Sequence, residues 1–459
     1  MNTKAKNTDQ VEICILAAGM GSRMKSDKPK VLHTLAGQPL LGHLVKTVQK
    51  IRPQRIHVVI GKGAAQVEQA FSDSGLNWVY QREQMGTGHA VMQALPGISA
   101  DSRVLILLGD APLIKLATVQ KLISAECDLG ILTVNLDNPF NYGRIVRGAG
   151  EQVLAIVEEK DATEDQRKIG EINSGVMITT GSLLTDWLSR IDTDNVQGEY
   201  LLTDIVGLAN QDGCKVSAIV TDDPLEASGI NNFSQLAKLE REYQMSRAEE
   251  LMEAGVHVID PTRIDIRGNL TVGKNVRIDI NCIFEGDVSL GDNVTVSSNC
   301  VIKDSTIAEG SLIKPNSMLD EATVGKNCTV GPFARLRPGA HLMNSVSVGN
   351  FVEIKKTTLG DGAKAPHLSY LGDAEIGANV NIGAGTITCN YDGVNKHKTE
   401  IADNVFVGSN SSLVAPVKIG AGATIGAGST ITHEVEAGLA IARGRQKVFA
   451  NWKGPRDKK

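Results

Sequence analysis

The sequence predicts two domains, an α/β domain followed by a parallel β-helix, with a long helix between them. Three observations lead to this prediction. Short apolar strands alternate with helical patterns over the first half. Strong helix formers then fill residues 232–254, and an aliphatic residue recurs at every sixth position over the second half. The length of 459 residues agrees, because one hydrophobic core rarely grows to that size.

Composition and charge restrict the possible classes of protein. The chain is 42% hydrophobic and 22% charged, as in ordinary soluble proteins. A net charge of -5 argues against a nucleic-acid partner, although residues 451–459 form a small basic tail. The polar residues 1–10 lack the apolar core of a signal peptide and are expected to be flexible. No apolar run approaches the ~18 residues of a membrane span, so no membrane partner is expected.

The seven cysteines are scattered and include no C-x-x-C pair. They are expected to be buried free thiols in a reducing compartment, which predicts a cytoplasmic protein.

A phosphate cradle is predicted at the end of the first strand. The apolar run Ile13–Leu16 leads directly into small residues, which let the backbone approach a ligand. Arg23 then offers a planar fork and Lys30 a point charge for phosphate oxygens. The pattern is neither the dinucleotide fingerprint, since Met24 replaces its third glycine, nor a P-loop. An ordinary strand-to-helix turn is the alternative.

Strands and helices alternate through the rest of the first half. Strands are expected at 55–60, 78–80, 104–108, 130–134, 153–157, 176–179 and 216–220, and helices at 39–51, 90–95 and 118–125. This alternation predicts a largely parallel sheet covered on both faces, with ligands beyond the carboxyl ends of its strands. Asp110 follows such a strand and could hold Mg²⁺, or it could simply belong to a turn.

Two resemblances make this site more specific. The stretch L-A-A-G-x-G-x-R-M followed by P-K resembles the signature of sugar-1-phosphate nucleotidyltransferases. Further segments, such as Gln84–Ala90, Asn141–Arg144 and Gly229–Asn232, follow in an order and spacing that resemble the bifunctional N-acetylglucosamine-1-phosphate uridyltransferase/glucosamine-1-phosphate acetyltransferase family. This resemblance covers residues 11 to about 450. It implies a Rossmann-like uridyltransferase domain at 11–231, a linker helix at 232–254 and an acetyltransferase domain at 255–450.

The resemblance also implies the roles of residues in the first domain. Arg23 and Lys30 would act on the phosphates of UTP, and Asp110 and Asn231 would hold Mg²⁺. Met20 stands where the family often has a lysine. The nucleotide and sugar would contact Leu16, Ala17, Ala18, Gly19, Lys30, Gln81, Gly86, Thr87, Leu108, Gly109, Asp110, Gly143, Glu158, Asn173 and Asn231.

The second half is periodic. Aliphatic residues and cysteines stand at every sixth position from Ile264 to Cys300, and after one slip at Thr306 the series continues through Leu312 and Met318 to Ile354. A later block runs from Ile376 to Ile431. A period of six predicts a β-helix whose inward residue recurs once per face. The resemblance adds that this β-helix is left-handed and forms homotrimers with active sites between subunits.

Two stretches, 361–372 and 386–400, interrupt the repeats. The first contains His367, whose imidazole suits proton abstraction from an amine, although a lone histidine is more often structural. The resemblance implies that His367 is the catalytic base and that Glu353 orients it. It also implies an amino-sugar phosphate site of Arg337, Lys355, Tyr370 and Asn381, and an acetyl-CoA site of Ala384, Asn390, Tyr391, Ser409, Ala427 and Arg443.

The sequence therefore predicts a bifunctional enzyme that acetylates glucosamine-1-phosphate and then uridylates the product to UDP-N-acetylglucosamine, a precursor of bacterial cell-envelope sugars. One alternative is a nucleotidyltransferase whose β-helix is structural or regulatory. Another is an assembly module whose first half binds a nucleotide without turnover. Lys355, His367 and Asn390 argue against the first alternative, and Arg23 with Lys30 against the second.

Overall fold

The computed structural model describes residues 10–19, 21–148, 152–450 and 452. Most of both predicted tails and Met20 therefore lie outside the described residues. The chain divides into two compact units, Met1–Tyr243 and Gln244–Lys459. The division falls inside helix α8, Phe233–Glu253. Within the described ranges, no helix is long and apolar enough to cross a membrane.

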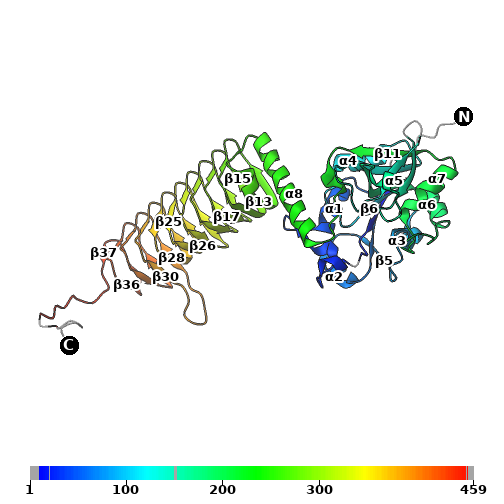
Figure 1. Cartoon of the computed structure of the whole chain (residues 1–459). Coiled ribbons are helices and arrows are strands. Elements are labelled where there is room, and N and C mark those ends of the chain that lie inside the picture. The colour runs from blue at the N-terminus through cyan, green and yellow to red at the C-terminus, as the bar shows by residue number, and fades with distance from the viewer. Residues whose placement is uncertain (1–9, 20, 149–151, 451, 453–459) are drawn as a thin grey trace, which may run out of the picture. The chain divides into compact units, whose positions relative to one another are not determined.

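A nine-stranded sheet forms the centre of the first unit (Figure 1). Its main path runs β11-β7-β10-β6-β1-β4-β5, and β8 and β9 extend it beside β10. The strands are β1 Val11–Leu16, β4 Arg55–Ile60, β5 Asn77–Tyr80, β6 Arg103–Leu108, β7 Leu129–Asn135, β8 Arg144–Arg147, β9 Val153–Val157, β10 Glu171–Thr180 and β11 Val216–Thr221. A short hairpin, β2 Thr34–Leu35 and β3 Gln38–Pro39, precedes the first helix.

Helices cover both faces of this sheet. One apolar cluster packs α1, α2 and α4 against one face, and a second packs α3, α6 and α7 against the other. Because side chains alternate along a strand, Ile13 and Ile15 enter the first cluster and Cys14 the second. The helices are α1 Leu40–Gln49, α2 Ala64–Ala70, α3 Thr87–Ala94, α4 Leu116–Ser124, α5 Glu164–Arg167, α6 Gly181–Leu188 and α7 Ile205–Gln211. The prediction of a doubly covered, largely parallel sheet is confirmed.

Two features of the sheet differ from the expectation. Strand β10 is antiparallel to both β6 and β7, and it begins at Glu171 rather than near Val176. The first residues of β10, from Glu171 to Asn173, pair with β7, and the register then shifts between Asn173 and Met177. This polar segment is therefore part of the strand. Strand β8 is an addition to the expected strands. It contains only two apolar residues, and an arginine stands at each end, so its sequence is a weak strand signal.

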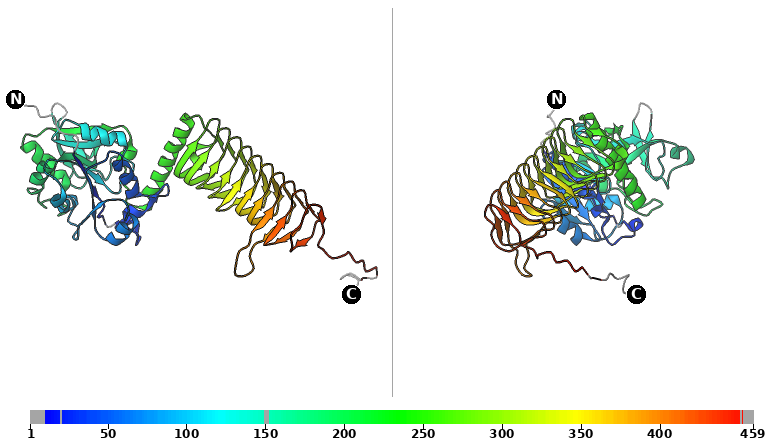
Figure 2. Two further views of the ribbon diagram at one scale, coloured as in Figure 1. Left: turned by 180° about the vertical axis from the view of Figure 1, so that it is seen from behind. Right: turned by 90° about the vertical axis from the view of Figure 1, so that its left-hand side faces the viewer.

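The second unit is a parallel β-helix (Figure 2). Its strands form two sheets in which all the pairs between successive coils are parallel. The first sheet contains β12 His257–Val258, β14 Arg277–Ile278, β16 Thr295–Val296, β19 Leu312–Ile313, β22 Thr329–Val330, β25 Ser347–Asn350, β27 Lys364–His367, β29 Asn381–Ile382, β32 Phe406–Val407, β35 Thr424–Ile425 and β37 Leu439–Ala440.

The second sheet wraps around the remaining sides of each coil. It contains β13 Ile264–Val272, β15 Cys282–Leu290, β17 Val301–Lys303, β18 Thr306–Ile307, β20 Met318–Asp320, β21 Thr323–Val324, β23 Arg335–Leu336, β24 Ala340–Leu342, β26 Glu353–Leu359, β28 Tyr370–Ile376, β30 Ile387–Cys389, β31 Thr399–Ile401, β33 Ser412–Val414, β34 Val417–Ile419 and β36 Thr430–Ile431.

The interior of the β-helix confirms the six-residue period but corrects one stretch of it. Ile264–Cys300 and Val324–Ile354 bury the expected positions. Between them, Ile313 and Leu319 face inward, whereas Leu312 is only half-buried and Met318 is 51% exposed. Ile307 follows Ile302 after five positions instead of six, and Val324 follows Leu319 after five positions as well. The series of inward-facing residues therefore shifts twice rather than once. Because strand side chains alternate, a shift by one residue turns each side chain to the opposite face.

All seven cysteines are free. Five are buried, and burial raises the pKa of the Cys14 and Cys282 thiols to about 12. Cys214 and Cys389 are half-buried. The expectation of free thiols is therefore confirmed, although two of them are partly accessible.

Candidate functional sites

The predicted phosphate cradle follows β1. Its glycine at position 21 has a φ of 59°, and a Cβ at this position would lie 2.9 Å from the Cβ of Lys30. A side chain there would therefore strain the turn and push Lys30 away. The carbonyl oxygen of Ala18 accepts a hydrogen bond from Gln84 Nε2 at 2.6 Å, which joins the cradle to the loop after β5.

Two cationic side chains of the cradle contact the two predicted metal ligands. The ammonium group of Lys30 forms an ion pair with Asp110 and lies 3.2 Å from Asn231 Oδ1. Arg23 Nη2 donates to the same Asn231 oxygen at 2.8 Å. Residues separated by 80 and 201 positions in the sequence therefore meet at one point beyond the sheet. The carboxylate and amide oxygens converge on a single cation position, which suits a hard metal ion as well as an ammonium group.

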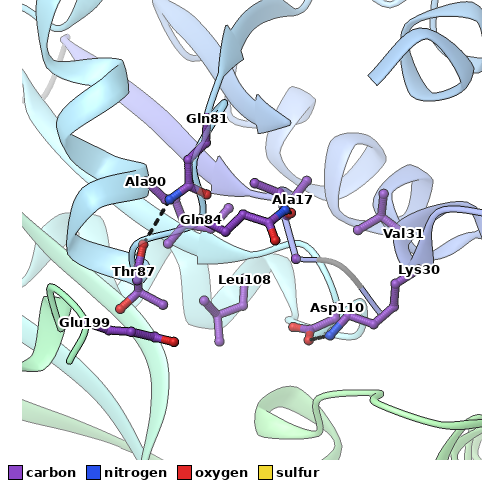
Figure 3. A pocket seen from close by; sticks show the side chains of 14 residues that line it. Ala17, Lys30, Val31, Gln81, Gln84, Thr87, Ala90, Leu108, Asp110 and Glu199 are labelled. Carbon is purple, nitrogen blue, oxygen red and sulfur yellow. Dashed lines mark hydrogen bonds and ion pairs between the residues drawn. The ribbon is translucent and has the colours of Figure 1, made fainter. Parts of the chain in front are cut away.

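Two adjoining pockets meet at this cluster. The first is drawn in Figure 3, where the side chains of Gln81, Gln84, Thr87, Leu108 and Asp110 surround it. The second shares Thr87, Leu108 and Asp110 with the first. The first pocket is lined by Leu16, Ala17, Ala18, Gly19, Lys30, Val31, Gln81, Gln84, Gly86, Thr87, Ala90, Leu108, Asp110 and Glu199. The second includes Tyr142, Gly143, Glu158, Asn173, Thr203 and Asn231. Two ligands could therefore meet at Asp110.

Several side chains that line the second pocket are polar and partly buried. Burial raises the pKa of Glu158, although the hydroxyl of Thr203, 3.3 Å from Glu158 Oε1, opposes that effect. Burial also raises the pKa of Asp204 nearby, and the carboxylates of Asp192 and Asp161 add to it. The backbone N–H of Asn173 donates to the Gly143 carbonyl at 2.9 Å. This bond joins strand β10, which contains Asn173, to the loop that contains Gly143. Carboxylate and amide groups in this pocket suit the hydroxyl and amide groups of a sugar.

A second cluster lies on the outer surface of the β-helix. Glu353 pairs in register with Tyr370 of the next coil, and its carboxylate accepts from Arg337 Nη1 at 2.7 Å. The ammonium of Lys396, together with Arg337, lowers the pKa of Lys355. Three cations therefore lie close to one another around Lys355, and such a cluster suits a phosphate group.

His367 ends β27, and its side chain is exposed. It pairs in register with Asn350 of the preceding coil. Within the described part of the chain, no hydrogen bond joins His367 to Glu353, whose carboxylate is bound to Arg337. Asn381 follows one coil later, in register with Lys364. The expected contact by which Glu353 would orient His367 is thus not formed in this structure.

The residues expected to bind acetyl-CoA stack along one corner of the β-helix. The N–H of Asn410, next to Ser409, donates to the Ala384 carbonyl at 2.7 Å. The N–H of Gly428, next to Ala427, donates to the Ser409 carbonyl at 2.8 Å. Arg443 Nη1 donates to the Ala427 carbonyl at 2.8 Å. Ala384, Ser409 and Ala427 therefore occupy equivalent places in successive coils, with Arg443 beside the last.

Asn390 and Tyr391 begin the segment between β30 and β31, which projects from the coils (Figure 1). The Asn390 amide donates to the Asp373 carboxylate, and Tyr391 is 60% exposed. The projecting segment also contains Lys396, so it brings a cation back to the coil that contains Lys355.

Sequence reasoning missed three residues of these sites. Glu199 lines the first pocket, and Thr203 lies against Glu158 in the second. Neither residue follows a strand of the sheet, whereas ligand contacts of such sheets are expected at strand ends. Lys396 belongs to the stretch 386–400 that interrupts the six-residue repeats, and the basic N-K-H-K run there is a signal that points to it.

Comparisons with known proteins agree with this division. Residues 13–168 match the model of the MobA-like NTP transferase domain, residues 266–359 match the GMPPB C-terminal domain, and residues 398–433 match the bacterial transferase hexapeptide with six repeats. A solved structure from Bacillus anthracis, described as a candidate glucose-1-phosphate thymidylyltransferase in complex with a sucrose, covers 50% of this chain and 94% of its own at 16% identity. The TM-score of this match is 0.41.

Two curated relatives match almost the whole chain. The "Bifunctional protein GlmU" of Marinobacter nauticus is 53% identical over 449 residues, which are 97% of this chain and 99% of the relative. The protein of the same description from Pseudomonas entomophila is 54% identical over 448 residues, which are 97% of this chain and 98% of the relative.

Proposed function

This chain belongs to the family of bifunctional GlmU proteins, and from that premise we propose how its two units divide two transferase reactions. The enzyme transfers an acetyl group from acetyl-CoA to glucosamine-1-phosphate. It also transfers a uridylyl group from UTP to N-acetylglucosamine-1-phosphate and releases pyrophosphate. The α/β unit performs uridylyl transfer, and the left-handed β-helix performs acetyl transfer. The observation that carries this division is that each unit has its own cluster of polar residues suited to one reaction.

In the α/β unit, UTP occupies the first pocket and N-acetylglucosamine-1-phosphate the second. A phosphate oxygen of the sugar attacks the α-phosphorus of UTP in line, a new P–O bond forms, and pyrophosphate leaves. No protein nucleophile is required, because the attacking phosphate is already ionised. Arg23 and Lys30 neutralise charge on the phosphates, and Glu158 and Asn173 hold the sugar. The shared lining at Asp110 supports this arrangement, because it lets the two substrates meet.

Asp110 and Asn231 fit a magnesium ion. Their oxygens converge on one position, and Mg²⁺ uses few carboxylates when phosphate oxygens complete its coordination. When bound, the ion would supply charge neutralisation at the phosphates. Lys30 holds that position in this structure, so it must move to the phosphates when the nucleotide and metal bind.

In the β-helix, Arg337, Lys355 and Lys396 bind the phosphate of glucosamine-1-phosphate. His367 takes a proton from the amine as the nitrogen attacks the acetyl carbonyl of acetyl-CoA, and coenzyme A leaves as a thiol. Acetyl-CoA lies along the corner of Ala384, Ser409 and Ala427, with Arg443 beside it. Glu353 orients His367 after the substrate phosphate has drawn Arg337 away from it.

The family also suggests assembly and location. The β-helix forms a homotrimer in the cytoplasm, and the active sites for acetyl transfer lie between subunits. An exposed aromatic pair supports this proposal, because Phe333 and Phe351 stack with centroids 5.3 Å apart and are 48% and 57% exposed. The product supplies the synthesis of cell-envelope polymers.

Two variants test the division of labour. His367→Ala should lose acetyl transfer by at least about a hundredfold and keep uridylyl transfer. Asp110→Ala should show the opposite pattern, with uridylyl transfer reduced by about a hundredfold or more. Free coenzyme A and pyrophosphate released by the same preparations are the two readouts. Wild-type protein that uridylates but does not acetylate would instead make the β-helix a scaffold.

A further inference from the structure

The nucleotide pocket adjoins a histidine that uridylyl transfer, as described above, does not use. His89 is half-buried in α3, one turn before Gln93. Its ring stacks on Tyr200, with centroids 6.4 Å apart. Nδ1 of His89 lies 3.1 Å from the amide nitrogen of Gln81, and Nε2 lies 3.1 Å from the amide nitrogen of Gln93. Both ring nitrogens therefore face side-chain amides.

The groups that face the Gln81 amide nitrogen determine how this amide is oriented. Gln81 Nε2 also lies 3.1 Å from the carbonyl oxygen of Gly86, which can only accept. Reversal of the amide would place two oxygens against each other, so the nitrogen faces both Gly86 and His89. A neutral imidazole has one acceptor and one donor. Nδ1 of His89 therefore accepts from Gln81, and Nε2–H donates to the oxygen of a reversed Gln93 amide. The reversal gives up only the 3.4 Å contact of Gln93 Nε2 with the His89 carbonyl, which is longer than the 3.1 Å bond from Gln81 to Gly86.

This arrangement leaves the Gln81 carbonyl oxygen for a ligand. Gln81 is only 4% exposed, and among the described residues its Oε1 has no hydrogen-bond partner. The residue lines the first pocket, and in Figure 3 its amide oxygen points away from the dashed bond that its amide nitrogen makes. A ligand that fills the pocket would cut this oxygen off from water, so the site favours a ligand that offers an N–H group.

We infer that His89 is a positioning residue that holds Gln81 as a hydrogen-bond acceptor and thereby selects uracil over cytosine. The inference rests on the proposed function of the pocket. Uracil presents N3–H as a donor, which the Gln81 oxygen can accept. Cytosine presents an unprotonated N3, which would face that oxygen without a hydrogen. Leaving such a buried pair unsatisfied reduces binding by about ten- to a hundredfold.

The test measures nucleotide preference in the full-length protein. His89→Phe keeps an aromatic ring beside Tyr200 but removes the acceptor for Gln81. Uridylyl transfer with UTP and cytidylyl transfer with CTP are compared through kcat/KM, using N-acetylglucosamine-1-phosphate. We expect the UTP to CTP ratio to fall about tenfold, because the Gly86 carbonyl alone then holds the Gln81 amide and its reversal costs one hydrogen bond instead of two. Acetyl transfer by the same preparation reports on folding and should be unchanged.

Two further variants sharpen the result. Gln93→Met removes the acceptor of the His89 Nε2–H, so it should lower the UTP to CTP ratio by less than His89→Phe does. His43→Phe is the matched control, because His43 binds the Leu35 carbonyl at 2.9 Å and does not line the pocket. It should leave the ratio unchanged.

An equal loss with both nucleotides in His89→Phe would indicate a structural role and overturn the inference, as would an unchanged ratio. Equilibrium binding of UTP and CTP to the same proteins gives the comparison without turnover. Wild-type protein that binds UTP in preference to CTP but transfers no uridylyl group would contradict the proposed function and leave the role of His89 intact. Gln93→Met provides the comparison if His89→Phe fails to fold.

Discussion

At the scale of single residues, Lys30 connects two roles of the proposed uridylyl site. Its ammonium occupies the point on which the oxygens of Asp110 and Asn231 converge. Lys30 is 11% exposed and Asp110 21%, so water screens this ion pair only in part. A metal ion that binds without nucleotide must therefore compete with the ammonium, whereas nucleotide phosphates give Lys30 another partner. Metal and nucleotide should consequently bind cooperatively.

Lys30→Met should tighten metal binding in the absence of nucleotide. The substitution removes the competing cation and leaves the Asp110 carboxylate without its partner, so the Kd for Mn²⁺ should fall by roughly tenfold. Electron paramagnetic resonance of free Mn²⁺ measures this directly. Uridylyl transfer should fall by about a hundredfold, since a phosphate contact is lost. The exposed Lys46 provides the control variant Lys46→Met. Weaker metal binding in Lys30→Met would show that the ammonium does not hold the metal position.

At the scale of elements, close contact between coils positions residues that we propose for acetyl transfer. Gly349 lies in β25, beside the strand β27 that ends at His367. A Cβ at position 349 would lie 1.9 Å from the carbonyl oxygen of Pro366. The obstacle is backbone, so the neighbouring coil must shift if a larger residue is introduced. The absence of a side chain at Gly349 thus fixes where His367 stands.

Gly349→Ala should impair acetyl transfer at least tenfold and reduce the free energy of unfolding of the β-helix by about 1–3 kcal/mol. Uridylyl transfer should be retained, because its site belongs to the other unit. Gly207→Ala is the matched control, since Gly207 lies in α7 and an added Cβ would meet nothing within 4 Å. Thermal unfolding and both activity assays provide the measurements. Normal acetyl transfer in Gly349→Ala would mean that the coil tolerates the shift.

At the scale of the whole molecule, the two units have separate cores and separate sites. Among the described residues, the apolar cluster of the β-helix shares no member with the two main clusters of the α/β unit. In the proposed assembly the two activities depend differently on the trimer. Acetyl transfer needs residues of neighbouring subunits, and uridylyl transfer does not. Exposed Phe333 and Phe351 on the β-helix are the surface through which this difference can be tested.

Phe351→Asp should dissociate the assembly, because a charge buried between subunits costs far more than the aromatic contact gains. Light scattering should then report a mass near the 48.9 kDa of one chain. Acetyl transfer should fall by about a hundredfold or more, with uridylyl transfer unchanged as the internal control. Phe351→Leu should remain assembled and active. A monomeric Phe351→Asp that still acetylates would place each acetyl site within one subunit.

Much of both units follows from the sequence alone. Local patterns are sufficient for the α/β sheet, for the six-residue period and for the polar residues that follow strands, because each depends on near neighbours in the chain. Only the tertiary structure decided that Leu319 rather than Met318 faces inward, since one omitted residue reverses the alternation of a strand. It alone also joined Lys30 to Asp110 and Asn231, and His89 to Gln81 as an acceptor. Those contacts depend on the direction of individual side chains and on segments brought together by the fold, which no local pattern encodes.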